Sequence, residues 1–180
     1  MNPGETDFPT QPIRPIPGAL RQAHAFMQQG DYTRAAPAFE ELARSAEARG
    51  GLRAPFLYIQ AGRARLSLHQ NTDGVANIRH GLELFASGQR FAQLYRSGNR
   101  AISELKTRGL DKDAREIASY LQAHIPAISE SPTQRGPDPS KVRLPALCPA
   151  CGGPLHVEDV EWISTTRAEC SFCGSAVAVE

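Results

Sequence analysis

Four cysteines are the residues of this chain whose type and spacing predict chemistry. They form two C-x-x-C pairs, and 18 residues separate the inner cysteines of the two pairs: Cys148, Cys151, Cys170 and Cys173. Two such pairs at this separation are typical of four thiolates around one tetrahedral Zn²⁺ ion. Because four thiolates leave no position open for water or substrate, we expect a single structural zinc rather than a catalytic one.

Each cysteine pair is followed directly by a glycine, Gly152 after CPAC and Gly174 after CSFC. Two residues between cysteines allow a tight turn that points both thiolates at one ion. Glycine takes positive φ at no steric cost, so backbone N–H groups can turn toward the negatively charged sulfur atoms. All four cysteines lie in the last 33 residues. In a reducing compartment this clustering favours metal binding over a disulfide scaffold.

Other roles for residues of this segment stay open at the level of sequence. CPAC alone is similar to a thioredoxin-type redox pair, although that role needs a βαβ context and leaves the second pair unused. His156 lies between the pairs and could replace one cysteine as a ligand. Trp162, the only tryptophan, is either an exposed contact residue or packs against the metal-binding turns.

The residues between and after the cysteine pairs predict three short strands, at 155–157, 160–165 and 177–179. A small β-sheet clamped by metal is the arrangement of a zinc ribbon, which this segment resembles in its cysteine pairs and its strands. The resemblance implies a small β domain over residues 147–180. A domain of roughly thirty residues buries too little apolar surface to fold unaided, so we expect zinc to supply the missing stability.

Ahead of the cysteines, composition divides the chain into three parts. Residues 1–17 are proline-rich without apolar periodicity, which predicts a disordered tail. Residues 18–125 are rich in helix-forming residues with helical apolar spacing. Residues 126–146 return to proline and predict a flexible linker. Breaks within the middle part predict six helices, at 19–29, 32–48, 54–69, 73–86, 90–108 and 111–124, with N-caps at Asp31, Asp73 and Asp111.

The helical part is similar to itself at a shift of 39 residues. Under this shift Ala23 falls on Gly62, Ala35 falls on Gly74, and bulky Phe39 falls on Ile78. A third copy follows at a similar shift, with Ala114 in the place of Gly74. Small residues at matching places predict pairs of helices that approach closely, while the bulky residues fill the groove between them.

GDYTRAAPAFEEL, residues 30–42, resembles the tetratricopeptide repeat family, and RGLDKDAREIASYL, residues 108–121, is a looser match. The repeat spacing exceeds the usual 34 residues of that family, and Asn71-Thr72-Asp73 replaces Gly-Asp-Tyr in the second copy. The resemblance implies antiparallel helical hairpins stacked side by side. An ordinary helical bundle is the alternative. The expected fold class is therefore α, of the TPR-like repeat type, with a small β zinc-ribbon domain.

The charge of the chain is uneven although its net charge is only +1. From residue 146 onward one arginine stands against five acidic residues, whereas residues 51–100 hold seven arginines against Asp73 and Glu83. We expect some of these arginines to line a groove for an acidic segment, either of a protein partner or of the cysteine segment itself: Arg53, Arg63, Arg65, Arg79, Arg90, Arg96 and Arg100. A solvated face enriched by codon bias explains the same residues.

These features favour a non-enzymatic protein–protein interaction adaptor, because helical repeat stacks present an extended surface that grips peptides or helices. The alternative is a nucleic-acid-associated protein of the transcription or translation machinery, where zinc ribbons are common. Only the basic helical region could then bind phosphate, because the cysteine segment is acidic. No Walker loop, G-x-S-x-G elbow, H-E-x-x-H helix or G-x-G-x-x-G turn occurs, and we expect no catalysis.

The sequence predicts a cytoplasmic protein that does not insert into a membrane. No stretch approaches 18 consecutive apolar residues, so no helix is expected to span a bilayer. The first residues are polar and proline-rich, without the basic start and apolar stretch of a secretory signal.

Overall fold

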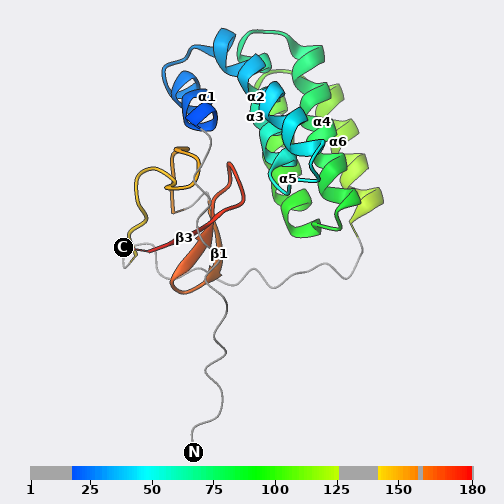
Figure 1. Cartoon of the computed structure of the whole chain (residues 1–180). Coiled ribbons are helices and arrows are strands. Elements are labelled where there is room, and N and C mark those ends of the chain that lie inside the picture. Colours follow the sequence, from blue (N-terminus) through cyan, green and yellow to red (C-terminus); the bar gives the residue numbers. More distant parts are fainter. Residues whose placement is uncertain (1–17, 126–141, 158–159, 180) are drawn as a thin grey trace, which may run out of the picture.

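A computed structural model describes residues 18–125, 142–157 and 160–179 of the chain (Figure 1). The predicted tail 1–17 and most of the predicted linker lie outside the described residues. The helices are α1 (Gly18–Gln28), α2 (Tyr32–Glu47), α3 (Ala54–Ser67), α4 (Asn71–Ser87), α5 (Phe91–Thr107) and α6 (Asp111–His124). The six predicted helices are confirmed, and each end lies within two residues of its predicted place.

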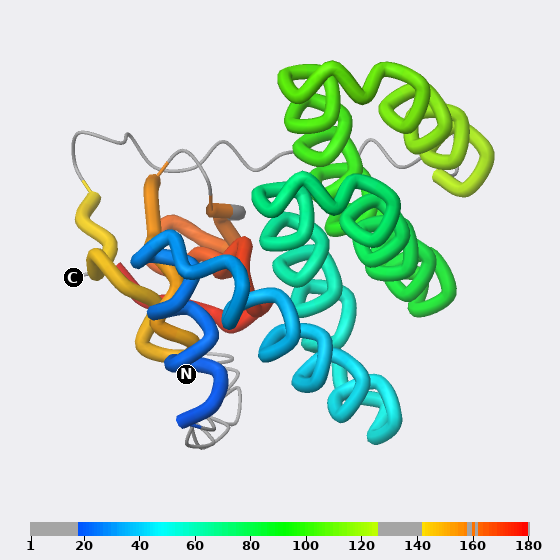
Figure 2. Tube along the Cα trace, turned by 90° about the horizontal axis from the view of Figure 1, so that it is seen from above, coloured from blue at the N-terminus to red at the C-terminus, as the bar shows by residue number. Residues whose placement is uncertain are grey.

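The helices pack against their neighbours in chain order, as Figure 2 shows. Close approach between α3 and α4 depends on small residues at the predicted positions. A Cβ on Gly62 would lie 2.6 Å from the carbonyl oxygen of Gly74, and a Cβ on Gly74 would lie 2.7 Å from Cγ of Leu66. The equivalent Ala23 and Ala35 are fully buried. The predicted role of small residues at these positions is therefore confirmed for this pair.

Only one of the three predicted N-caps is confirmed. Asp31 caps α2, and its Oδ1 accepts a hydrogen bond of 3.1 Å from the backbone N–H of Arg34. The other two predictions are wrong, because α4 begins at Asn71 and α6 begins at Asp111 itself. Asp73 and Asp111 lie inside the first turn, where a carboxylate still interacts favourably with the helix dipole.

The C-terminal module, which we define as residues 142–157 and 160–179, holds a three-stranded antiparallel sheet in the order β1-β2-β3. The strands are β1 (Glu161–Ser164), β2 (Arg167–Glu169) and β3 (Ala176–Ala178). In the register of the sheet, Ala168 of β2 pairs with Trp162 of β1 and with Val177 of β3. In both overall views the module lies beside α1 and away from α6 (Figures 1 and 2).

The predicted strands are confirmed in part. Strands β1 and β3 lie within one residue of the predicted 160–165 and 177–179 at each end. The predicted strand at 155–157 is wrong, because this segment follows an isolated bridge between Leu147 and Pro154 and Leu155 instead packs into the core. Strand β2 was not predicted, because its three residues Arg-Ala-Glu carry little β-propensity.

Two hydrophobic clusters hold the described residues together. The first joins α1, α2 and α3 to the C-terminal module, and it includes all four cysteines. The second joins α3 to α4, α5 and α6. Helix α3 contributes to both clusters, so it is buried on almost all sides. Among the described residues, none of the helices is long and apolar enough to cross a bilayer.

Candidate metal centre

The four predicted cysteines converge in the C-terminal module. Their sulfur atoms all lie within 4.8 Å of one another, with 3.9 Å between Cys148 and Cys173 and 3.9 Å between Cys151 and Cys170. Four sulfur ligands at a Zn–S distance of about 2.3 Å form a tetrahedron with edges of about 3.8 Å. The spacing therefore fits one tetrahedral metal ion, and each pair of cysteines supplies half of the ligand set.

The backbone of each pair forms the same tight turn. Gly152 has φ 75° and Gly174 has φ 68°. The Gly152 N–H donates to the Cys148 carbonyl at 2.8 Å, and the Gly174 N–H donates to the Cys170 carbonyl at 2.8 Å. The left-handed conformation at both positions favours glycine, as the sequence predicted.

Backbone N–H groups turn toward the sulfur atoms, as expected of ligands that carry negative charge. Three of them lie 3.4 Å from a sulfur: Ala150 N to Cys148 Sγ, Gly153 N to Cys151 Sγ, and Phe172 N to Cys170 Sγ. Such donors stabilise thiolates and fix their orientation. These contacts therefore suit a cluster of thiolates better than a cluster of neutral thiols.

The cysteine cluster is closed to solvent, because each cysteine is at most 2% exposed. Hydrogen bonds from the other three thiols lower the pKa of Cys173, whereas hydrogen bonding to Cys148 raises the pKa of Cys151. Several thiolates packed this closely without water need a cation among them. The donor set and its burial fit a soft or borderline metal such as Zn²⁺.

Two alternatives for the cysteine segment lose support. His156 is exposed and is not among the described side chains that converge on the cluster. A thioredoxin-type pair needs a parallel βαβ unit, whereas the sheet of the module is antiparallel. Trp162 is half-buried on β1, where it pairs with Ala168 of β2. Both of its predicted roles therefore stay predictions.

The second cysteine turn packs directly on α1 and α3. The ring of His24 in α1 lies between Phe39 of α2 and Phe172 of the turn, with ring centroids 5.0 Å and 5.6 Å away in edge-to-face contacts. Burial lowers the pKa of His24 to about 4, so this histidine is neutral near pH 7. Its Nε2 is buried without a hydrogen-bond partner among the described residues. His24 therefore acts chiefly as a packing residue.

Polar contacts secure the same interface at its edges. Gln28 Nε2 at the end of α1 donates to the Gly152 carbonyl at 3.0 Å, and Arg53 Nη2 donates to Ser175 Oγ at 3.0 Å. A Cβ on Gly174 would lie 2.6 Å from Cε2 of Phe56, so the second turn touches α3 at van der Waals distance. The module is therefore packed on the helices through both of its cysteine turns.

Arg90 makes a charged contact to the module. Its guanidinium lies over the rings of Phe56 and Phe85, at 5.1 Å and 5.0 Å from their centroids, and is 4.0 Å from Glu169 Oε1. Gln93 Nε2 also donates to Glu169, at 3.2 Å. The acidic module thus lies against part of the arginine-rich surface, which is the intramolecular arrangement that the charge pattern suggested.

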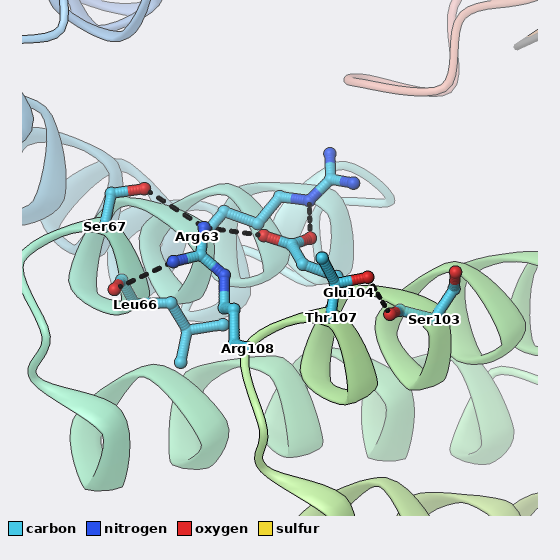
Figure 3. Close-up of polar contacts among 7 residues, drawn as sticks. All are labelled: Arg63, Leu66, Ser67, Ser103, Glu104, Thr107 and Arg108. Carbon is cyan, nitrogen blue, oxygen red and sulfur yellow. Dashed lines mark hydrogen bonds and ion pairs between the residues drawn. The ribbon is translucent and has the colours of Figure 1, made fainter.

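Three other predicted arginines join helices to one another. Arg65 donates to both carboxylate oxygens of Glu40 at 2.7 Å, and Arg79 pairs with Glu116. Arg63 Nε lies 2.9 Å from Glu104 Oε2, and Arg108 approaches the same carboxylate from the end of α5 (Figure 3). The last two, Arg96 and Arg100, lie on α5 in the wall of a cavity. Binding of a partner by any of the seven stays a prediction.

This cavity, of about 360 Å³, lies between α3, α5 and the C-terminal module. Sequence reasoning placed Arg63, Arg96 and Arg100 near a groove but missed other residues that line it. Among these are Phe56, Gln60 and Ser171. Nothing in the sequence around these residues predicts a site. They come together only because the module packs on α3.

Comparison of the chain with protein-family models, with curated proteins and with solved structures finds no match. The function is therefore argued from the geometry of the cysteine cluster and the surfaces around it.

Proposed function

We propose that this chain is a non-enzymatic protein-interaction adaptor that contains one structural Zn²⁺ ion bound by Cys148, Cys151, Cys170 and Cys173. The observation that supports it is the buried cluster of four sulfur atoms at tetrahedral spacing, packed against α1 and α3. A four-thiolate set has no open position for a substrate, so the metal stabilises structure. The stack of helices, TPR-like in its proposed class, supplies the surface for a partner.

Zinc content tests the metal half of the proposal. Protein purified under reducing conditions is expected to contain one zinc per chain by elemental analysis, and Cys170→Ser is expected to lose it. Ser164→Ala in the same module is the matched control, because its hydroxyl contacts Thr166 rather than a cysteine. Reduced, folded protein without stoichiometric metal would refute this half.

Capture of a partner tests the adaptor half. Tagged protein is expected to recover one protein in stoichiometric amount from a nuclease-treated lysate, and the purified pair is expected to bind by calorimetry. Loss of the complex after nuclease treatment would instead favour the nucleic-acid alternative. That alternative has less support, because Arg53, Arg63, Arg65, Arg79 and Arg90 contact groups within the chain.

A salt series with a labelled RNA or DNA oligonucleotide separates the two functions directly. Binding through phosphate contacts weakens steeply as salt rises. We expect no specific binding near physiological salt.

A further inference from the structure

The C-terminal module lies on one face of the helical stack, and the first helix of each successive pair contributes to that face. We call it the docking face. Its residues are Arg21, His24 and Gln28 on α1, Arg53 and Phe56 at the start of α3, and Arg90 and Gln93 at the start of α5. Within each helix these residues are three or four positions apart, so they lie on one side of it.

Helix α3 is too apolar to be left uncovered on the docking face. Eleven of its fourteen residues are buried, whereas α1 buries three of eleven and α5 buries four of seventeen. A helix that is apolar on every side needs a neighbour on every side. Helices α2 and α4 pack along α3, and the module covers its start, where Gly174 meets Phe56.

The module reaches the docking face through the residues next to its clustered cysteines. Every module residue in these contacts lies within two positions of one of the four cysteines: Gly152, Glu169, Phe172, Gly174 and Ser175. The shape of the two cysteine turns is therefore also the shape that fits the helices. A metal ion that held the turns would hold the docking surface of the module as well.

The rest of the helical stack has a core that does not depend on the cysteines. Helices α4, α5 and α6 share the second hydrophobic cluster with α3, and none of the four cysteines belongs to it. The module, in contrast, is too small to keep its two turns in place without a metal. Metal loss is therefore expected to act on the docking face and to leave the second cluster folded.

We propose that the C-terminal module is a metal-held cover over the docking face. With the metal bound, the module closes the face. When the metal is lost, the cysteine turns lose their shape, the module leaves, and the apolar start of α3 becomes accessible. The inference rests on the metal half of the proposed function, and it adds that metal content decides whether this face of the adaptor is open or closed.

Removal of zinc from the full chain tests the opening of the face. Reduced, zinc-loaded protein is treated with a chelator in the presence of anilinonaphthalene sulfonate, a dye that fluoresces on exposed apolar surface. We expect the dye signal to rise on chelation and to fall when zinc is added back, while most of the far-ultraviolet circular dichroism of the helices is kept. An unchanged dye signal, or loss of most of the helical signal, would overturn the proposal.

Thermodynamic linkage gives a sharper test, because a cover that is held by the metal must in turn help to hold the metal. Gln93 Nε2 donates to Glu169 at 3.2 Å, so Gln93→Glu places two carboxylates against each other. Gln122→Glu makes the same isosteric change at an exposed position of α6. We expect Gln93→Glu to weaken zinc affinity about tenfold in a competition with a colorimetric chelator, and Gln122→Glu to leave it unchanged. Equal affinity in Gln93→Glu and the wild type would overturn the proposal.

A second pair of variants repeats this test from α1. Gln28→Ala removes the hydrogen bond to the Gly152 carbonyl, whereas Gln29→Ala truncates the neighbouring exposed glutamine. We expect Gln28→Ala to weaken zinc affinity about threefold and Gln29→Ala to have no effect. Equal zinc affinity in these two variants would contradict docking of the module through α1.

Zinc analysis of the wild type separates failure of this inference from failure of the proposed function. Reduced, folded protein that holds no zinc would refute the metal half, and the cover with it. Protein that holds one zinc, with an affinity that neither Gln93→Glu nor Gln28→Ala changes, would keep the metal centre and exclude the cover.

Discussion

The two glycines that follow the cysteine pairs allow packing of the module on α3 to be measured separately from turn geometry. Gly152 and Gly174 have nearly the same positive φ, 75° and 68°, and the same hydrogen bond to a cysteine carbonyl. Their surroundings differ. A Cβ on Gly152 meets its nearest neighbour, Arg21 Cγ, at 3.7 Å, whereas a Cβ on Gly174 would lie 2.6 Å from Phe56.

Alanine at either position has to adopt a left-handed conformation, which costs about 1–2 kcal/mol. At Gly152 the methyl group adds no further cost, because its nearest neighbour, Arg21 Cγ, lies at an ordinary contact distance of 3.7 Å. At Gly174 the methyl group overlaps the Phe56 ring, which is 4% exposed and packs edge-to-face on Phe85 with ring centroids 4.9 Å apart, so a shift of the ring disturbs that contact. Overpacking of this kind costs about 1–3 kcal/mol more. We expect Gly174→Ala to be less stable than Gly152→Ala by about 2 kcal/mol, or about 4–8 °C in melting temperature.

The assay is thermal unfolding of zinc-loaded protein, followed at 222 nm because most of that signal comes from the helices. Phe56→Leu gives the second arm, since a smaller side chain makes room for the new methyl group. In the Phe56→Leu background the difference between the two alanine variants is expected to shrink. Equal melting temperatures for Gly174→Ala and Gly152→Ala would refute the packing of the second cysteine turn on α3.

Three further predictions concern the metal, a buried histidine and an ion pair. Chelation of zinc is expected to speed hydrogen exchange in α1 as well as in the module, while α6 stays protected, because α1 shares a hydrophobic cluster with the cysteines and α6 does not. Burial lowers the pKa of His24 to about 4. Between pH 6.5 and pH 4 this histidine therefore binds a proton in the unfolded state but not in the folded state. Stability should therefore fall on acidification by up to about 3 kcal/mol more in the wild type than in His24→Leu, and the His24 ring signal should not titrate near pH 6.5 in an NMR series. Arg65→Lys keeps the charge but loses the two-point contact with Glu40, and we expect chemical denaturation to show a loss of about 1 kcal/mol. Unchanged exchange in α1, a His24 signal that titrates near pH 6.5, or an unaltered denaturation midpoint would count against the respective prediction.

The sequence predicted the features that depend on local chemistry. Helix limits followed from apolar spacing and from breaks such as Gly30 and Gly109, which adopt positive φ of 74° at the ends of α1 and α5. The clustering of the four cysteines followed from two C-x-x-C pairs, whose turn geometry is set by a few neighbouring residues. Strand β2 was missed because three residues carry too weak a signal, and its pairing with β1 and β3 is a tertiary property.

Packing of the module on the helices could not be predicted from local patterns. No local pattern around His24 predicts its place between Phe39 and Phe172. Phe56 looked like one more apolar residue of a helix, yet it lies under Gly174 and Arg90. Contacts between residues more than 100 positions apart depend on how the elements meet, which helical periodicity does not encode.

The hydrophobic cluster that joins the cysteines to α1, α2 and α3 extends the effect of the proposed metal beyond the C-terminal module. Cys170 and Ser171 lie in the cavity wall, and Cys170 is also one of the four clustered cysteines. Phe56 forms part of the cavity floor and also contacts Gly174 of that turn. A metal ion that fixed this turn would therefore also fix one wall of the cavity.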